Sequence, residues 1–212
     1  LRSRPFTQKS LAKLDGFIRH CVRTAFRLTA DTNRSFFYTS CRYGGLGLTC
    51  LAEESDVQTV VQCFKMLNNP DENIKVMFAQ RLLRLAKRTG SDATLEDGQM
   101  ITKYLNREAN ASSSSNSGRS FDIVHRTRRA LGRLKLSFQR LGDISDTQEW
   151  SHVGIAEGGK FDFSLQTDKR QGCEELIHPS ARGKITKVIH NRVTHRHYLM
   201  WREKTAQGTV LK

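Results

Sequence analysis

The spacing of apolar residues near the start of the chain limits its fold more than any other feature. Between residues 7 and 28 these residues recur at steps of three and four, which is the period of an α-helix that buries one side. They are Leu11, Leu14, Phe17, Ile18, Cys21, Val22 and Ala25. The opposite side is basic, and Asp15 is the one acidic residue in this stretch. We therefore predict a helix over 7–28 that packs its apolar side and turns Arg19, Arg23 and Arg27 outward as a ladder.

Five further stretches carry helical signals. Ser55 can cap a helix that runs to about residue 67, and Asn69 followed by Pro70 marks the start of one that runs to about residue 88. The others are expected at 95–109, 121–141 and 180–204. In the first two of these helices we predict an inward-facing set: Val57, Val60, Val61, Phe64, Leu67, Ile74, Met77, Phe78, Leu82 and Leu85.

Two short stretches depart from the helical period. Residues 35–39 are aromatic, and we expect them to be extended or irregular. Apolar residues alternate on both sides of Gly158-Gly159, which is the pattern of a β-hairpin at about 150–166. The predicted fold class is therefore mainly α, a helical bundle followed by a basic helical region with one small β-hairpin.

A run of serines divides the chain. Residues 112–117 are small and polar with nothing to bury, which indicates a linker over 111–118. We expect one helical domain at 1–110 and a basic helical region at 119–212. Because the chain begins with Leu1 instead of Met and ends just after a Gln207-Gly208 turn signal, we also expect it to be a segment of a longer polypeptide.

Three glycines stand within four positions at Gly44, Gly45 and Gly47. Glycine allows positive φ angles and a close approach of the backbone, so these residues predict a tight structural turn that inserts Leu46 and Leu48 into the core. The spacing is not that of a phosphate-cradling loop, because no Lys-Ser or Lys-Thr follows.

The basic excess of the chain is concentrated in three segments. The sequence has 35 Lys and Arg against 21 Asp and Glu, a net charge of +14. Residues 1–42 contribute +7, 119–140 contribute +6 and 178–212 contribute +7, so the remainder is acidic. Such clustering favours a polyanion partner, since Lys and Arg that neutralise phosphates release counterions, and the alternative is a surface charged for solubility alone. The candidate nucleic-acid-binding residues are Lys13, Arg19, Arg23, Arg27, Arg126, Arg128, Arg129, Arg133, Lys187, Arg192 and Arg196.

The sequence lacks the residue patterns of several kinds of catalytic and metal-binding site. No Asp-Asp pair is present for a two-metal polymerase site, and no nucleotide-binding glycine motif occurs. Cys173, His178, His190, His195 and His197 have poor spacing for zinc, so we expect no metal and no cofactor in this chain. The five cysteines are odd in number and unclustered, and no apolar run reaches the ~20 residues that cross a bilayer, so we expect an intracellular protein.

The order of several motifs resembles a known family. Leu14-Asp15-Gly16-Phe17-Ile18-Arg19 is followed by Val22-Arg23, then Phe37-Tyr38, then Gly44-Gly45-Leu46-Gly47-Leu48. This order is similar to the thumb and the following linker of non-LTR retrotransposon reverse transcriptases, in the site-specific branch that carries a restriction-like endonuclease. The similarity is good over 11–90, thin over 91–180 and suggestive over 185–208, where Trp201 and Gln207-Gly208 stand.

The resemblance implies a role without implying catalysis. It implies a thumb helix along the minor groove of an RNA–DNA template–primer duplex during target-primed reverse transcription, with Arg19, Arg23 and Arg27 on the hybrid. The arginines of 121–141 would contact element RNA or target DNA. The carboxylates and Mg²⁺ of the RNA-directed DNA polymerase would belong to the palm of the parent protein, the remainder of which would be a partner. A nuclear location would follow.

Two other interpretations remain open. One is a freestanding helical RNA- or DNA-binding module whose motif resemblance is accidental. The other is an inactive remnant of a retroelement. Whether the chain is part of an enzyme therefore depends on its parentage.

Overall fold

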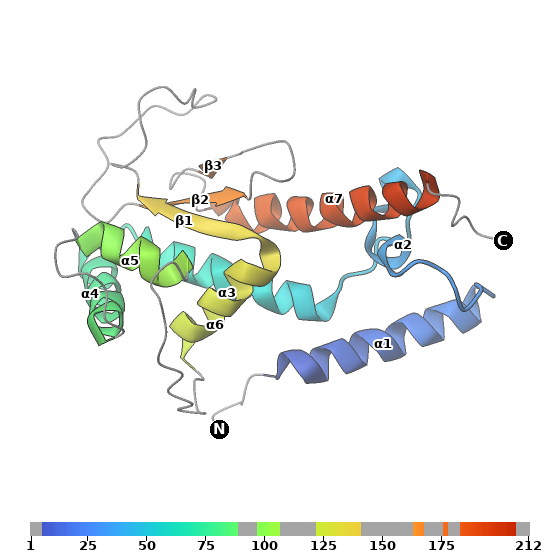
Figure 1. The fold of residues 1–212 in the computed structure, drawn as a ribbon, viewed down its shortest axis with the longest axis horizontal. Coiled ribbons are helices and arrows are strands. Elements are labelled where there is room, and N and C mark those ends of the chain that lie inside the picture. Colours follow the sequence, from blue (N-terminus) through green and yellow to red (C-terminus); the bar gives the residue numbers. More distant parts are fainter. Residues whose placement is uncertain are drawn as a thin grey trace. The chain divides into compact units, whose positions relative to one another are not determined.

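The computed structural model describes residues 6–88, 97–106, 122–140, 163–167, 176–177 and 183–206. Within these ranges the protein has seven α-helices, one short 3₁₀ helix and a three-stranded antiparallel sheet (Figure 1). The mainly α fold class predicted from the sequence is confirmed. No helix in the described ranges combines the length and apolar character needed to cross a membrane.

The elements follow one another in a simple order. The helices are α1 (Gln8–Ala25), α2 (Arg34–Tyr38), η1 (Cys41–Tyr43), α3 (Leu51–Leu67), α4 (Glu72–Arg88), α5 (Asp97–Asn106), α6 (Ile123–Leu134) and α7 (Ile185–Ala206). The strands are β1 (Leu136–Arg140), β2 (Phe163–Thr167) and β3 (Leu176–Ile177), in the spatial order β1-β2-β3.

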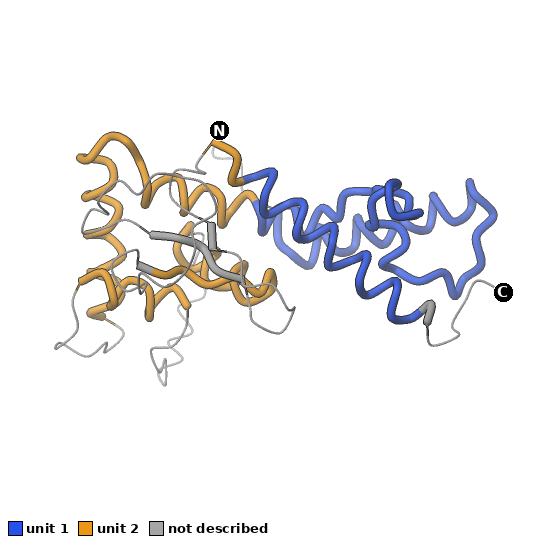
Figure 2. The backbone as a smooth tube through the Cα atoms, turned by 90° about the horizontal axis from the view of Figure 1, so that it is seen from above, with its two compact units in different colours: residues 1–57, 186–212 blue, residues 58–185 orange. Residues whose placement is uncertain are grey.

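The chain forms two compact units, which Figure 2 shows in different colours. Unit 1 comprises Leu1–Val57 and Thr186–Lys212, and unit 2 comprises Gln58–Ile185. The serine-rich linker predicted at 111–118 lies outside the described residues. The division into units runs instead through α3 and the start of α7, so the C-terminal helix belongs with the N-terminal segments.

Unit 2 is built around a core of large apolar side chains. Phe64 of α3 stacks on Phe138 of β1 with ring centroids 6.5 Å apart. Asn106 of α5 pairs with the backbone of Phe138, donating to its carbonyl at 2.8 Å and accepting from its N–H at 2.8 Å. Because β1 is at the edge of the sheet formed by the described strands, this side chain satisfies backbone groups that would otherwise lack a strand partner there. The inward set predicted for α3 is confirmed: Val57, Val60, Val61, Phe64 and Leu67 are all buried.

The helix predicted over 121–141 is wrong in its second half. It ends at Leu134, Lys135 adopts a left-handed conformation with φ +58°, and β1 follows at once. In β1 the buried Leu136 and Phe138 alternate with Ser137 and Gln139, a period of two that only strand pairing can use. β2 is the strand that pairs with it, in the register Phe138 to Leu165.

The hairpin predicted at 150–166 falls mostly outside the described residues. Gly158-Gly159 and the apolar residues before them are not described, whereas β2 overlaps the expected second strand. In the structure, β2 pairs with β1 on one side and β3 on the other.

Three other local predictions are corrected. Residues 34–38 form the short helix α2, whereas 35–39 were expected to be extended or irregular. Helix α3 begins at Leu51, four residues before Ser55, and on α4 Met77 is 64% exposed although it was expected inside. Phe78 and Leu82 take the buried side of α4, which rotates Met77 toward solvent.

Candidate nucleic-acid interface

Helix α1 is rotated about its axis from the orientation that the sequence predicts. Its buried residue is Asp15, only 1% exposed, whereas Leu14 is 47% and Phe17 is 65% exposed. Cys21, on the same side as these two, is also exposed. Part of the predicted apolar face is therefore at the surface, and part of the predicted outward face, Arg19 and Arg23, turns toward the rest of unit 1.

The reason lies in a helix start 36 residues further along the chain. The carboxylate of Asp15 accepts hydrogen bonds from the backbone N–H groups of Leu51 at 2.8 Å and Ala52 at 3.1 Å, and from the Cys50 thiol at 3.3 Å. The first N–H groups of a helix have no partner within the helix, and a negative charge there is favoured by the helix dipole. Asp15 thus caps α3, and this contact fixes which side of α1 is buried.

Arg19 and Arg23 follow Asp15 at four-residue steps and share its buried side. Arg19 donates a hydrogen bond to the hydroxyl of Tyr38, and its guanidinium lies 5.8 Å from that ring centroid. Arg23 donates to the carbonyl of Thr32 at 3.1 Å and lies 5.3 Å from the ring of Phe37. Both guanidiniums are half-buried against α2 and its surroundings instead of projecting outward.

The predicted arginine ladder therefore does not form. Helix α1 ends at Ala25, and Arg27 beyond it is exposed with a positive φ of 51°. Arg27 therefore lies outside the helical repeat that would align it with Arg19 and Arg23. Burial raises the pKa of Tyr38 even though the hydrogen bond from Arg19 acts in the opposite direction, so the contact is between a cation and a neutral phenol.

The glycine turn holds the aromatic residues of α2 in place. Gly44 and Gly47 have positive φ angles of 83° and 66°, and a side chain on Gly45 would overlap the backbone carbonyl of Thr39. The turn folds back on α2, because Leu46 N–H donates to the carbonyl of Phe36 at 3.0 Å and Leu48 N–H donates to that of Phe37 at 2.8 Å. Leu46 and Leu48 then pack on the cluster of Phe37, Tyr38 and Cys50.

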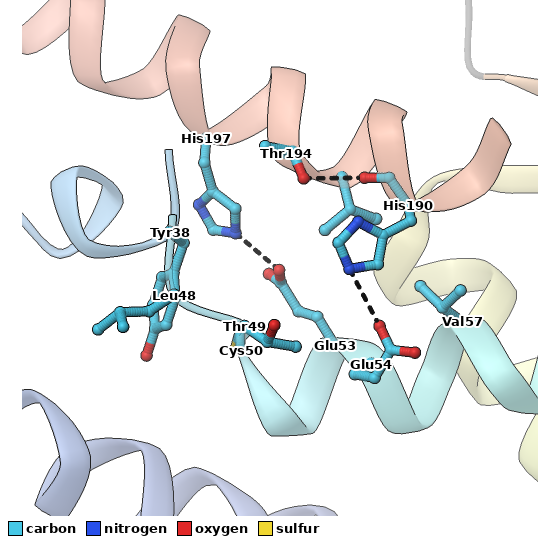
Figure 3. A pocket seen from close by; sticks show the side chains of 11 residues that line it. Tyr38, Leu48, Thr49, Cys50, Glu53, Glu54, Val57, His190, Thr194 and His197 are labelled. Carbon is cyan, nitrogen blue, oxygen red and sulfur yellow. Dashed lines mark hydrogen bonds and ion pairs between the residues drawn. The ribbon is translucent and has the colours of Figure 1, made fainter. Parts of the chain in front are cut away.

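Ion pairs join α7 to α3 within unit 1. Glu53 accepts from Arg196 at 2.8 Å. Glu53 also contacts Nε2 of His197 at 2.6 Å, and His190 lies 3.3 Å from Glu54 (Figure 3). Arg196, a predicted nucleic-acid contact, is thus half-buried and engaged inside the protein. Burial alone raises the pKa of Glu53, but the hydrogen bond from His197 and the charges of His197, Arg196 and Arg34 outweigh it and hold the pKa below its ordinary value.

A small cavity lies beside these pairs, lined from α3 by Glu53 and Val57 and from α7 by His190, Thr194 and His197 (Figure 3). Its volume is about 20 Å³. That space suits a water molecule and is far below the several hundred Å³ of a cofactor site.

The arginines of α6 are divided between two environments in unit 2. The guanidinium of Arg128 lies 4.2 Å over the ring of Tyr104, and Arg126 donates to Thr59 Oγ1 at 3.4 Å. Arg129 and Arg133, one turn apart, are exposed. On α7, Lys187 is exposed and Arg192 is half-buried.

Most of the described acidic residues of unit 1 are buried or half-buried within the unit. Asp15 and Asp56 are buried, and Glu53 and Glu54 contact histidines of α7. Among its described residues, the exposed acidic side chains are Asp31 and Glu203. The exposed basic side chains form what we call the basic surface of unit 1: Lys9, Lys13, Arg27, Arg34, Arg42, Lys187, Arg202 and Lys204.

In the described part of the chain, no group of three or more His, Cys, Asp or Glu side chains is arranged to hold a metal ion. The histidines of α7 instead contact carboxylates and aromatic rings. Cys173 and His178 lie outside the described residues.

Comparisons with protein-family models, with curated proteins and with solved structures returned no significant match.

Proposed function

We propose that this chain binds the phosphate backbone of nucleic acid, as the thumb and linker part of a non-LTR retrotransposon reverse transcriptase that holds an RNA–DNA template–primer duplex. The observation that carries the proposal is the imbalance of charge on unit 1. Eight exposed Lys and Arg side chains stand against two exposed acidic ones among its described residues.

The internal pairing of acids explains how this imbalance arises. Each carboxylate that caps a helix or pairs with a histidine inside unit 1 is partly or fully withdrawn from the surface, whereas the described lysines and half of the described arginines of the unit are exposed. A surface of one sign raises the local concentration of a polyanion and speeds its association. Contacts of this kind position a duplex without reading its sequence.

The corrected orientation of α1 changes which residues would touch the duplex. Lys9 and Lys13 lie on the exposed side of the helix and would contact phosphates. Arg19 and Arg23 would act indirectly, since they hold α2 and the glycine turn against α1. Arg129 and Arg133 on α6 would supply a second, separate set of contacts to RNA or target DNA.

This role assigns no catalytic step to the chain. In the parent protein the palm would hold the catalytic carboxylates and Mg²⁺, and the thumb would keep the duplex in register with them. Work on chromosomal target DNA would require a nuclear location, which is part of the same proposal.

Fluorescence anisotropy with a labelled RNA–DNA hybrid tests the proposal. Between about 50 and 200 mM salt, the unmodified chain should bind with a negative slope of log affinity against log salt. The double variant Lys9→Gln, Lys13→Gln should flatten that slope by about 0.9 for each phosphate that is no longer neutralised, taking the B-DNA value as a guide.

The matched control is Lys9→Arg, Lys13→Arg, which keeps both charges and should keep the slope. The weakening should be the same for hybrids of unrelated sequence, because phosphates carry no base information. No binding of hybrid at the low-salt end, or a slope that the neutral variant leaves unchanged, would overturn the proposal. Binding of every duplex type with equal affinity would favour a freestanding nucleic-acid-binding module over a polymerase thumb.

A further inference from the structure

Three aromatic side chains from distant parts of the sequence meet in unit 1. Tyr43 of η1 stacks on Tyr198 of α7, with ring centroids 4.5 Å apart and planes inclined by 26°. His195, also on α7, lies 6.3 Å from Tyr43 and 5.7 Å from Tyr198. We call Tyr43, His195 and Tyr198 the aromatic platform.

Two of the three rings of the aromatic platform are exposed and Tyr198 is half-buried, unlike the buried aromatic core of unit 1. Tyr43 is 41% exposed and His195 is exposed, whereas Phe37 is fully buried. A different side chain, Trp201, also packs at this end of α7, since its ring lies 5.9 Å from Phe36 and against Gly44. The packing of α7 here therefore does not depend on the platform alone. Part of the Tyr43 ring remains accessible to a ligand.

Two exposed arginines are close to the aromatic platform along the chain. Arg42 immediately precedes Tyr43 and is exposed. Arg202 is exposed and follows Tyr198 by four residues and His195 by seven, so these three residues share one side of α7. The rings of His195 and Tyr198 thus lie on the same side of α7 as the positive charge of Arg202.

This combination matches the chemistry of an unpaired nucleotide. An unstacked base has two π-faces that lie well on tyrosine or histidine rings, and its phosphate is bound by a neighbouring arginine. A base pair inside a duplex has both faces covered by its neighbours and offers only its edges.

We propose that the aromatic platform stacks with unpaired bases of single-stranded nucleic acid, while Arg42 and Arg202 bind the adjacent phosphates. This inference rests on the proposed function and names a second substrate class for it. The competing interpretation is that the three rings only fix η1 on α7.

The first test needs no variant. The unmodified chain is titrated with a fluorescent oligouridylate on the order of ten nucleotides long, and with an abasic ribose-phosphate strand of equal length and charge. Stacking predicts that the base-bearing strand binds more tightly, by about 5- to 150-fold for one base in full stacking contact. Equal affinity for the two strands would overturn the inference.

The second test removes the rings. Tyr43→Leu, Tyr198→Leu should lose the preference for the base-bearing strand, while the hybrid duplex keeps its affinity. The matched control Tyr43→Phe, Tyr198→Phe keeps both rings and should behave as the unmodified chain does. If the leucine and phenylalanine variants bind the oligouridylate equally, the platform is structural only. A thermal melt checks that both variants fold. If the leucine variant does not fold, the comparison of the oligouridylate with the abasic strand on the unmodified chain tests the inference.

These outcomes separate the two proposals. Binding of the hybrid with no preference for base-bearing single strands would reject the aromatic platform and leave the proposed function intact. Absence of binding to the hybrid, to the oligouridylate and to the abasic strand would reject both.

Discussion

The carboxylate of Asp15 accepts the backbone N–H of Leu51 at 2.8 Å, so a buried acid on α1 supplies the cap for the start of α3. This pair decides the orientation of α1. Once Asp15 faces inward, the helical repeat carries Arg19 and Arg23 onto Tyr38 and Phe37 and leaves Phe17 in solvent.

Asp15→Ala should lower the free energy of unfolding by about 2 kcal/mol, because it leaves two helix-start N–H groups without their acceptor. Chemical denaturation followed by circular dichroism measures the change. Asp31→Ala, which removes an exposed carboxylate from the same unit, is the matched control and should stay within about 0.5 kcal/mol of the unmodified chain. Equal destabilisation of the two variants would contradict the capping role.

Phe17→Ala tests which side of α1 packs, with Phe37→Ala on α2 as the reference for a buried ring. Phe37 is fully buried, so its truncation should cost about 3–5 kcal/mol, whereas truncation of the 65% exposed Phe17 should cost no more than about 0.5 kcal/mol. The same denaturation experiment compares them. A large destabilisation by Phe17→Ala would restore the orientation that the apolar pattern alone predicts.

The pKa of Glu53 predicts a loss of stability in acid. Because the folded protein holds this pKa below its ordinary value of 4.5, the ionised form contributes stability above that value, and the contribution is lost as the pH falls through the lowered pKa. Glu53→Gln should therefore be less stable than the unmodified chain at neutral pH, by about 2 kcal/mol, since His197 is buried and loses its charged partner. The difference should shrink below about pH 4.

Unfolding curves recorded at several pH values measure this convergence. Glu203→Gln, at an exposed position on α7, is the control and should show no such dependence. Parallel pH curves for Glu53→Gln and the unmodified chain would show that the pairing with His197 and Arg196 does not contribute.

The cysteines should differ sharply in reactivity. Burial raises the pKa of the Cys63 thiol to about 12, so at neutral pH it is almost entirely protonated and shielded from solvent. Burial also raises the pKa of Cys50, whereas Cys21 and Cys41 are exposed. In a Cys173→Ser background, a thiol reagent should modify Cys21 and Cys41 rapidly and the other two only after unfolding. Mass spectrometry locates the modified residues, and rapid labelling of Cys63 would contradict its burial.

Local patterns predicted much of the fold. The inward residues of α3, the positive φ angles at Gly44 and Gly47 and the mainly helical fold class all follow from periodicity and glycine chemistry, which act over a few residues. The switch from α6 to β1 also had a local sign, the alternation of apolar and polar residues after Lys135, but Leu131, Leu134 and Phe138 also fit the helical repeat of three and four. Pairing with β2 selected the strand.

The sequence predicted which basic residues are candidates for the site, but not whether their side chains point to solvent or into the protein. Lys13, Arg27, Arg129, Arg133 and Lys187 are exposed as a nucleic-acid contact requires. Arg19, Arg23, Arg126, Arg128 and Arg196 turn toward rings, a carbonyl, a hydroxyl or a carboxylate within the protein. The sequence pattern does not distinguish an exposed arginine from one paired within the protein. The long side chain can bury its stem and place its charge either in solvent or at an internal partner.

By itself, therefore, the sequence determined that this protein is helical, basic and tightly turned at its glycines, since these properties depend on residue type and near neighbours. The tertiary structure alone decided which side of α1 is buried, which arginines reach solvent and that α7 belongs with the first helices. Those outcomes depend on partners such as Leu51 for Asp15 and Glu53 for His197, which lie 36 and 144 residues away along the chain.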